Sequence, residues 1–285
     1  MSLAPFRVIS VREAGVALTA LQPLAEAVFG AQGRSPGWFA RKLAREAIDP
    51  GRSFLALGPG DVRIGYLLIS DDPLDRVAHS AGLGVLAEHR RRGVGSALID
   101  RASAELVGAA PALQFLAEPP LRGFYERLGF TAQRTCHTLR STGTGAVGLD
   151  LREHPPAAWT LPGHAVAGWR PGTWSRTPSA DAATVSLLDG GAWAHLSREG
   201  RAIVVQRLCV AGDPATTLVA DTHAALDELR GRLSRGTALL VVGCEAVSCV
   251  TASLLRHEHW QVAQTAVEMR RVIGEGVDKH AGPAA

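Results

Sequence analysis

Hydrophobic and polar positions follow regular periods through the first half of the chain. Residues 6–11 alternate as in a half-buried strand, and residues 21–28 repeat their apolar positions at helical spacing. Ser35 and Pro36 are residue types favoured at the cap and the first position of a helix, so a second helix is expected to begin there. The chain is therefore predicted to open with one strand and two helices.

Extended runs follow, and they predict a meander of three strands. Residues 53–58 and 62–70 flank the turn-forming sequence Pro59-Gly60-Asp61, and residues 78–85 form the third run. Helix, strand, helix and strand are then expected over residues 94–106, 112–119, 121–129 and 130–141. The expected fold class is α/β (α+β), with a mixed, mostly antiparallel sheet flanked by helices.

The second half of the chain partly repeats the first. Gly, Pro and Ser are concentrated around residue 150, which predicts one domain over residues 1–150 and another over residues 151–285. Three segments recur in the same order: residues 83–85, 112–119 and 130–140 align with residues 208–210, 238–245 and 260–270. This order favours a tandem duplication. Residues 159–189 look loop-rich, so the second copy is expected to have lost much of the first helical pair.

Composition and charge exclude several classes of protein. The 285 residues are 46% hydrophobic and 20% charged, as in an ordinary globular protein, and no run approaches the roughly 18 apolar residues of a membrane span. A net charge of +3 with one basic run, Arg90 to Arg92, gives no ground for a nucleic-acid partner. The four cysteines lie in apolar sequence without zinc-ligand spacing. We therefore expect a cytoplasmic protein with buried free thiols, no metal and no membrane partner.

One segment combines the features of an anion-binding site. A strand ends at Val85, three arginines follow, and Gly93 and Gly95 flank the start of a helix. The first amides of a helix lack partners inside it and carry a partial positive charge, so they bind anions. Glycine lets the backbone approach a diphosphate without a Cβ in the way. These features together indicate an anion-binding site far more specifically than a lone Gly-x-Gly sequence does.

The same residues resemble the GNAT acetyltransferase superfamily. Its acyl-CoA motif, Arg/Gln-x-x-Gly-x-Gly/Ala after a strand ending in valine, is matched by Arg90, Gly93 and Gly95 after Val85. Its second motif, an aromatic-Tyr helix ending in Gly-Phe, is matched by residues 124–130. The resemblance covers residues 6–140. The chain departs from it at Glu118, where many members have asparagine.

The resemblance implies an acetyl-CoA groove. Backbone amides of the strand end would pair with the pantetheine arm, and those of the basic glycine loop would hold the pyrophosphate. The cofactor-binding residues expected on this basis are Leu83, Gly84, Val85, Arg90, Arg91, Arg92, Gly93, Val94, Gly95, Ser96 and Phe124. An amide near Val85 would face the thioester oxygen, where negative charge develops.

The resemblance also suggests catalytic and acceptor-binding residues. Tyr125 would protonate the leaving thiolate. His79 stands where several members carry a glutamate, and histidine as a residue type titrates in the range suited to a general base. Strict alternation would put His79 on the same face of its strand as Leu83 and Val85. Trp38 and Phe39 are expected near the acceptor, although a structural role is open for each of these residues.

The leading functional interpretation is an acyltransferase that moves acetyl from acetyl-CoA to a primary amine by direct attack in a ternary complex. The acceptor would be a small-molecule amine or a peptide N-terminus, and the protein a monomer or homodimer. The alternative is a catalytically inactive acyl-CoA-binding regulatory or scaffold protein. The second copy is expected to be silent and structural, because Asp213 and Pro214 replace its glycine loop and Leu255 replaces its tyrosine.

Overall fold

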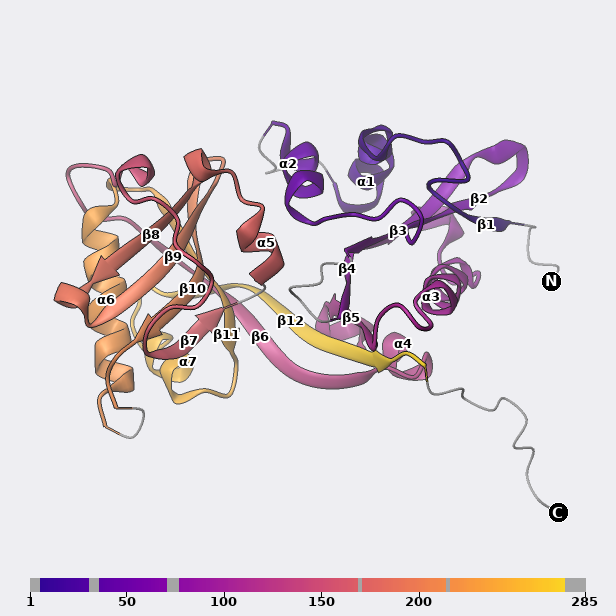
Figure 1. Ribbon diagram of the computed structural model, residues 1–285. Helices are drawn as coiled ribbons and strands as arrows, with labels where there is room; N and C mark the ends of the chain where they lie inside the picture. Colours follow the sequence, from indigo (N-terminus) through magenta and orange to yellow (C-terminus); the bar gives the residue numbers. More distant parts are fainter. Residues whose placement is uncertain (1–5, 31–35, 71–76, 169–170, 214–215, 275–285) are drawn as a thin grey trace, which may run out of the picture.

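The computed structural model describes residues 6–30, 36–70, 77–168, 171–213 and 216–274. It contains two lobes joined by a long two-stranded ribbon (Figure 1). The mixed α/β fold class with a mostly antiparallel sheet is confirmed. Among the described residues no helix is long and apolar enough to cross a membrane. Within the same residues, no group of three or more His, Cys, Asp or Glu side chains is arranged to hold a metal ion.

The N-terminal lobe follows the predicted order of elements closely. Its strands and helices are β1 (Arg7–Ser10), α1 (Gln22–Phe29), α2 (Trp38–Arg45), β2 (Phe54–Leu57), β3 (Arg63–Ser70), β4 (Ala78–Val85), α3 (Val94–Glu105), β5 (Ala112–Ala117) and α4 (Arg122–Arg127). The ribbon strand β6 (Thr131–Thr142) follows. One expected boundary is wrong: α2 begins at Trp38, after Gly37 in a left-handed conformation (φ 69°), and not at Pro36. Ser35, the expected cap, lies outside the described residues.

The C-terminal lobe holds more regular structure than the sequence suggested. Its elements are β7 (His164–Gly168), α5 (Pro171–Ser175), β8 (Ala182–Leu187), β9 (Ala192–Glu199), β10 (Ala202–Val210), α6 (Leu218–Arg232), β11 (Ala238–Glu245), α7 (Cys249–Leu254) and β12 (Gln261–Val272). The stretch 159–189 was expected to be mostly loop, and that expectation is wrong because two strands and a short helix lie in it. Cys249 is exposed and only the other three cysteines are buried, which corrects the expectation for the thiols.

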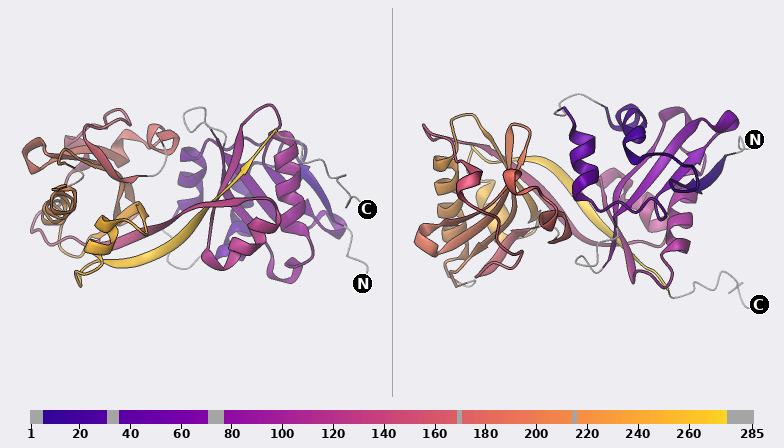
Figure 2. Two further views of the ribbon diagram at one scale, coloured as in Figure 1. Left: turned by 90° about the horizontal axis from the view of Figure 1, so that it is seen from below. Right: turned by 45° about the horizontal axis from the view of Figure 1, so that its top comes forward.

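The two lobes exchange their last strands. The sheet order is β1-β2-β3-β4-β5-β12-β6-β11-β10-β9-β8, so β12 lies beside β5 and β6 lies beside β11. β4 is parallel to β5, and β10 is parallel to β11. The order β4-β5-β12 is thus mirrored by β10-β11-β6. Figure 2 shows the two ribbon strands running side by side between the lobes.

The register of the ribbon has the symmetry expected of a duplicated sequence. Thr131 lies opposite Arg270, and Gln261 lies opposite Arg140. In the repeat Gln261 is the counterpart of Thr131, and Arg270 is the counterpart of Arg140. Equivalent residues therefore pair reciprocally, as they would across a two-fold axis. This register supports the interpretation of two copies, whose boundary near residue 150 stays a prediction.

Both faces of the N-terminal sheet are covered. Helices α3 and α4 pack on one face, over a core that includes Leu98, Phe115 and Met269. Helices α1 and α2 cover the other face, over a core that includes Phe39 and Ala81. We call these the α3 face and the α1 face. Because Met269 belongs to β12, the N-terminal core is completed by the end of the chain.

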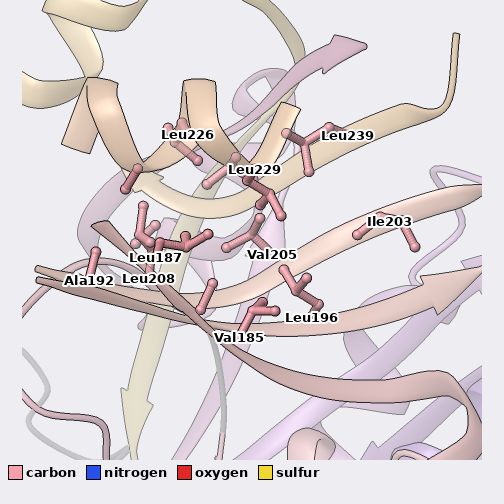
Figure 3. Packing of buried hydrophobic residues seen from close by; sticks show 14 of the residues in the cluster. Val185, Leu187, Ala192, Leu196, Ile203, Val205, Leu208, Leu226, Leu229 and Leu239 are labelled. Atoms are coloured by element: carbon pink, nitrogen blue, oxygen red, sulfur yellow. The ribbon is translucent and has the colours of Figure 1, made fainter. Parts of the chain in front are cut away.

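The C-terminal core lies between its strands and α6. Leu226 and Leu229 of α6 pack against β8 to β11, as Figure 3 shows. Leu139 of β6 belongs to this core, which is the reciprocal of the place of Met269 in the other lobe. The segment after β6 is not a loose linker, since the Gly143 and Gly145 amides donate to carbonyl oxygens of Thr237 and Leu233.

Candidate active site

The candidate site begins where β4 and β5 diverge. The two strands pair only at Ala78–Leu113 and His79–Gln114. β3 follows the other edge of β4 from His79 to Val85. Beyond His79, the second edge of β4 therefore faces a gap that no other strand of the described residues fills. This gap leaves backbone groups of β4 free to bind a ligand as an added strand would.

A β-bulge in β4 changes which residues share a face. Leu68 lies opposite Gly82 and Ile69 opposite Ser80, so Ala81 is an extra residue in β4. Leu83 and Val85 pack toward the α3 face, whereas Ala81 packs into the core of the α1 face. His79 shares the face of Ala81. The expectation that His79, Leu83 and Val85 lie on one face is therefore wrong, because the bulge breaks the alternation.

The basic glycine loop is held against the end of β4. The Arg90 Nε donates to the carbonyl oxygen of Val85 at 3.0 Å. Arg91 and Gly93 have positive φ values of 59° and 81°, a conformation that favours glycine at the second position. Gly93 is the N-cap of α3 and provides no side-chain cap. The first amides of α3 are therefore directed at the gap without partners inside the helix.

Tyr125 lies in an aromatic cluster on the other side of the gap. Its ring centroid is 4.9 Å from that of Phe115, 5.1 Å from that of Phe124 and 5.7 Å from that of Phe130. The side chain is 4% exposed. Burial raises the pKa of Tyr125 far above its usual value, and the negative charge of Glu118 raises it further. The phenol therefore keeps its proton at neutral and mildly alkaline pH.

These elements enclose a cavity of about 710 Å³. It lies between the end of β4, the start of α3 and α4, so both sequence motifs face the same space. The sequence-predicted residues that line it are Leu83, Val85, Arg90, Arg91, Gly93, Val94, Gly95, Ser96, Phe124 and Tyr125. A volume of this size accommodates an elongated small molecule.

Five predicted site residues do not line this cavity. Gly84 faces α1, where a Cβ would come within 2.8 Å of Val28, so this glycine is needed for helix packing. Arg92 is exposed beside the loop. His79 is 8% exposed at the closed end of the gap. Trp38 and Phe39 belong to α2, on the α1 face, and Phe39 is 1% exposed within the core there, which leaves it almost no surface for an acceptor.

Several lining residues were missed in the sequence. Gly123 and Arg127 lie on α4 with Tyr125, and the neighbouring Pro120 and Leu121 line the cavity too. Helical spacing could have found Gly123 and Arg127, which are four residues apart and therefore share one face of the helix. Pro120 and Leu121 carried no chemical signal.

The equivalent gap in the C-terminal lobe is filled by the chain itself. β10 pairs with β9 along one edge, and its other edge pairs with β11 only from Ala202 to Val205. From Arg207 to Val210 that second edge pairs with β7. β7 packs closely against β11, because a Cβ on Gly243 of β11 would overlap the carbonyl oxygen of Gly168 in β7. β7 therefore occupies the gap that is open beside Leu83 to Val85 in the first lobe.

Comparison with known proteins identifies this arrangement. The family model described as "Acetyltransferase (GNAT) domain" matches residues 50–132, which run from just before β2 into β6 and include both motifs. The chain carries a GNAT acetyltransferase domain. This GNAT domain contains the open gap, the glycine loop and Tyr125, and it supports an acyl-transfer activity in general terms. A comparison with curated protein sequences gave no match.

Solved structures show the GNAT fold over nearly the whole chain. A GCN5-related N-acetyltransferase from Sphaerobacter thermophilus is 17% identical, with a TM-score of 0.55 over 96% of this chain and 97% of that one. One from Anabaena variabilis is 14% identical, with a TM-score of 0.56 over 95% and 73%. The GCN5-related glucosamine N-acetyltransferase region of a fungal multi-domain GH3 β-N-acetylglucosaminidase is 12% identical, with a TM-score of 0.63 over 95% and 38%. At these identities the likeness concerns the fold alone.

Proposed function

We propose that this protein transfers an acetyl group from acetyl-CoA to a primary amine by direct attack within a ternary complex. The observation that carries the proposal is a cavity that residues of both GNAT motifs line, one motif supplying helix-start amides and the other a protonated tyrosine. The acceptor is a small-molecule amine or a peptide N-terminus.

The residues present fit acetyl-CoA. Three exposed arginines and the unpartnered first amides of α3 suit a diphosphate. A Cβ added to Gly95 would lie 3.5 Å from Phe124, so the glycine leaves space in the cavity beside this ring. Arg90 occupies the carbonyl oxygen of Val85, and the rest of the open β4 edge from Leu83 to Val85 suits the amides of the pantetheine arm. Acetyl-CoA bound there supplies the activated acyl group.

Tyr125 would act on the leaving thiolate from within the aromatic cluster. Because burial raises its pKa far above the roughly 8.5 of a thiol, the phenol holds its proton more tightly than the thiolate would. Tyr125 would therefore stabilise the departing sulfur chiefly by donating a hydrogen bond as negative charge develops. The closely packed rings of Phe115, Phe124 and Phe130 hold it in place.

His79 is proposed as the general base. The bulge puts it on the α1 face, opposite Leu83 and Val85. If acyl-CoA lies along Leu83 to Val85, an amine that approaches from the α1 face meets His79 before it meets the thioester. A base on the acceptor side collects the ammonium proton directly or through water.

Thiol release tests the proposal most directly. The full-length protein is incubated with acetyl-CoA and a panel of primary amines, including diamines, amino acids and dipeptides, and free CoA thiol is measured. Amine-dependent release, with acetylated amine detected by mass spectrometry, is the expected result. Tight acetyl-CoA binding without release for any amine would favour the inactive acyl-CoA-binding alternative. An acidic limb of the pH–rate profile that disappears in His79→Gln would support the base.

A further inference from the structure

Helix α2 depends on its surroundings for its position. It has eight residues, and its N-cap, Gly37, makes no side-chain cap hydrogen bond. Isolated helices shorter than about 12 residues are marginal in water. Phe39 anchors α2 to the core of its own lobe, and Trp38 and Leu43 pack against the same core. These contacts hold the side of α2 that faces its own lobe.

The second anchor comes from the other lobe. Arg45, the last residue of α2, forms an ion pair with Glu199, the last residue of β9. The Arg45 side chain is 16% exposed and that of Glu199 is 28% exposed. Burial lowers the pKa of Arg45, and the negative charges of Glu46, the residue after α2, and of Asp181 in the C-terminal lobe oppose that shift. A charge this buried needs its partner, since leaving it alone is costly.

The two lobes also meet at α5. Helices α2 and α5 pack against one another, and Figure 1 shows them facing each other across the space between the lobes. Trp38, Arg41 and Arg45 share one face of α2, since they are three and four residues apart. The same face thus carries Trp38, the half-buried one of the two expected acceptor residues, and Arg45 of the interlobe ion pair.

We infer that the C-terminal lobe sets the acceptor side of the active site by holding α2 through Arg45 and Glu199. Glu199 is then a positioning residue for the amine, although it lies outside the matched GNAT domain. The inference rests on the proposed function, in which the amine approaches the α1 face that α2 covers. The described residues that line the proposed acetyl-CoA groove all belong to the N-terminal lobe. This ion pair is therefore expected to affect the binding of the amine and not that of acetyl-CoA.

Steady-state kinetics of Glu199→Gln separates the two substrates. The variant keeps the shape of the side chain and removes its charge. We expect the KM for the amine to rise about tenfold, because small displacements of positioning elements have large kinetic effects, while the KM for acetyl-CoA is unchanged. Lys42→Gln is the matched control, since it removes the ion pair between Lys42 of α2 and its C-cap residue Glu46, and should leave both KM values unchanged.

A charge exchange tests the pair itself. Arg45→Glu and Glu199→Arg should each raise the KM for the amine, and the double variant should recover most of the loss. Thermal unfolding confirms that each variant is folded. An unchanged amine KM in Glu199→Gln, or a double variant no better than the single ones, would overturn the inference.

A readout without catalysis keeps the two proposals separate. If the wild-type protein released no thiol with any amine, the proposed function would fail. Amide hydrogen exchange in α2 would still decide the role of the ion pair, with faster exchange expected in Glu199→Gln. Identical exchange in the wild type and this variant would contradict it.

Discussion

Met269, near the end of the last strand, lies opposite Phe115 of β5 and is fully buried in the N-terminal core. The strand that carries Met269 belongs by sequence to the second copy. Leu139 of β6 is equally buried in the core of the other lobe. Each lobe therefore takes one central strand of its sheet from the other copy, and its sheet is incomplete without that strand. A chain ending near Leu149 should expose the edge of β5 and aggregate.

Met269→Ala should destabilise the N-terminal lobe although it changes the end of the chain. Truncating a fully buried methionine removes apolar contacts and leaves a cavity, at a cost of about 2–5 kcal/mol. Urea unfolding followed by circular dichroism measures this loss. Val272→Ala on the same strand is the control, because Val272 is 62% exposed and its truncation should cost less than about 0.5 kcal/mol. Equal effects of the two substitutions would contradict the exchanged-strand core.

Tyr125→Phe should preserve the fold and the affinity for acetyl-CoA while lowering turnover. The ring keeps its contacts with Phe115, Phe124 and Phe130, and only the hydroxyl is lost. Removing a hydrogen-bond donor that stabilises developing negative charge typically costs about a hundred- to a thousandfold in rate. Single-turnover kinetics, with calorimetry for binding, measures both quantities. A variant that binds acetyl-CoA normally and turns over at the wild-type rate would assign Tyr125 to packing.

His195 should make the C-terminal lobe less stable in acid. Its ring is stacked 4.1 Å from Trp174, its Nδ1 lies 3.0 Å from the Thr184 hydroxyl, and its Nε2 lies 3.2 Å from the carbonyl oxygen of Trp159. Burial lowers the pKa of His195 to about 4. His195 therefore takes up a proton at lower pH in the folded state than in the unfolded state, where histidine has its usual pKa of about 6.5.

The sign of this effect follows from proton linkage. The contribution of neutral His195 to the free energy of unfolding is fully present above the unfolded-state pKa. This contribution is lost as the pH falls from about 6.5 toward 4. The loss should reach about 3 kcal/mol. Urea unfolding between pH 7 and pH 4 measures it, and His195→Gln should flatten the dependence. A wild-type profile as flat as that of the variant would refute the assignment.

Local pattern was enough to place most elements. β4 begins and ends where the sequence predicted, at Ala78 and Val85, because a polar loop and a charged loop bound a short apolar run. The repeat also predicted which strands are equivalent. The exchange of β6 and β12 could not be predicted, since either strand can pair with β5 by the same alternation. β7 was missed because its sequence, HAVAG, is rich in small residues and is held in place by pairing with β10.

The candidate site was predictable where chemistry depends on backbone geometry. Gly93 and Gly95 signalled a loop that approaches an anion, and both line the cavity. The place of His79 was not predictable by alternation, because one extra residue reverses the faces of a strand. Gly82, with φ at 148°, carried the signal of that bulge. The interlobe contact of Arg45 had no signal at all, since its partner lies in the other copy.

The full-length protein should bind one molecule of acetyl-CoA, in the N-terminal lobe. The C-terminal gap is filled by β7 along Arg207 to Val210, and Asp213 would repel a diphosphate at the place of the glycine loop. Gly95→Val tests where the one molecule binds, because its branched side chain would enter the space beside Phe124, whereas the single Cβ of Gly95→Ala would make an ordinary contact there. Isothermal titration should give one site for the wild type, near-normal affinity for Gly95→Ala and no measurable binding for Gly95→Val. A stoichiometry of two, or unchanged affinity in a folded Gly95→Val, would show that acetyl-CoA binds elsewhere.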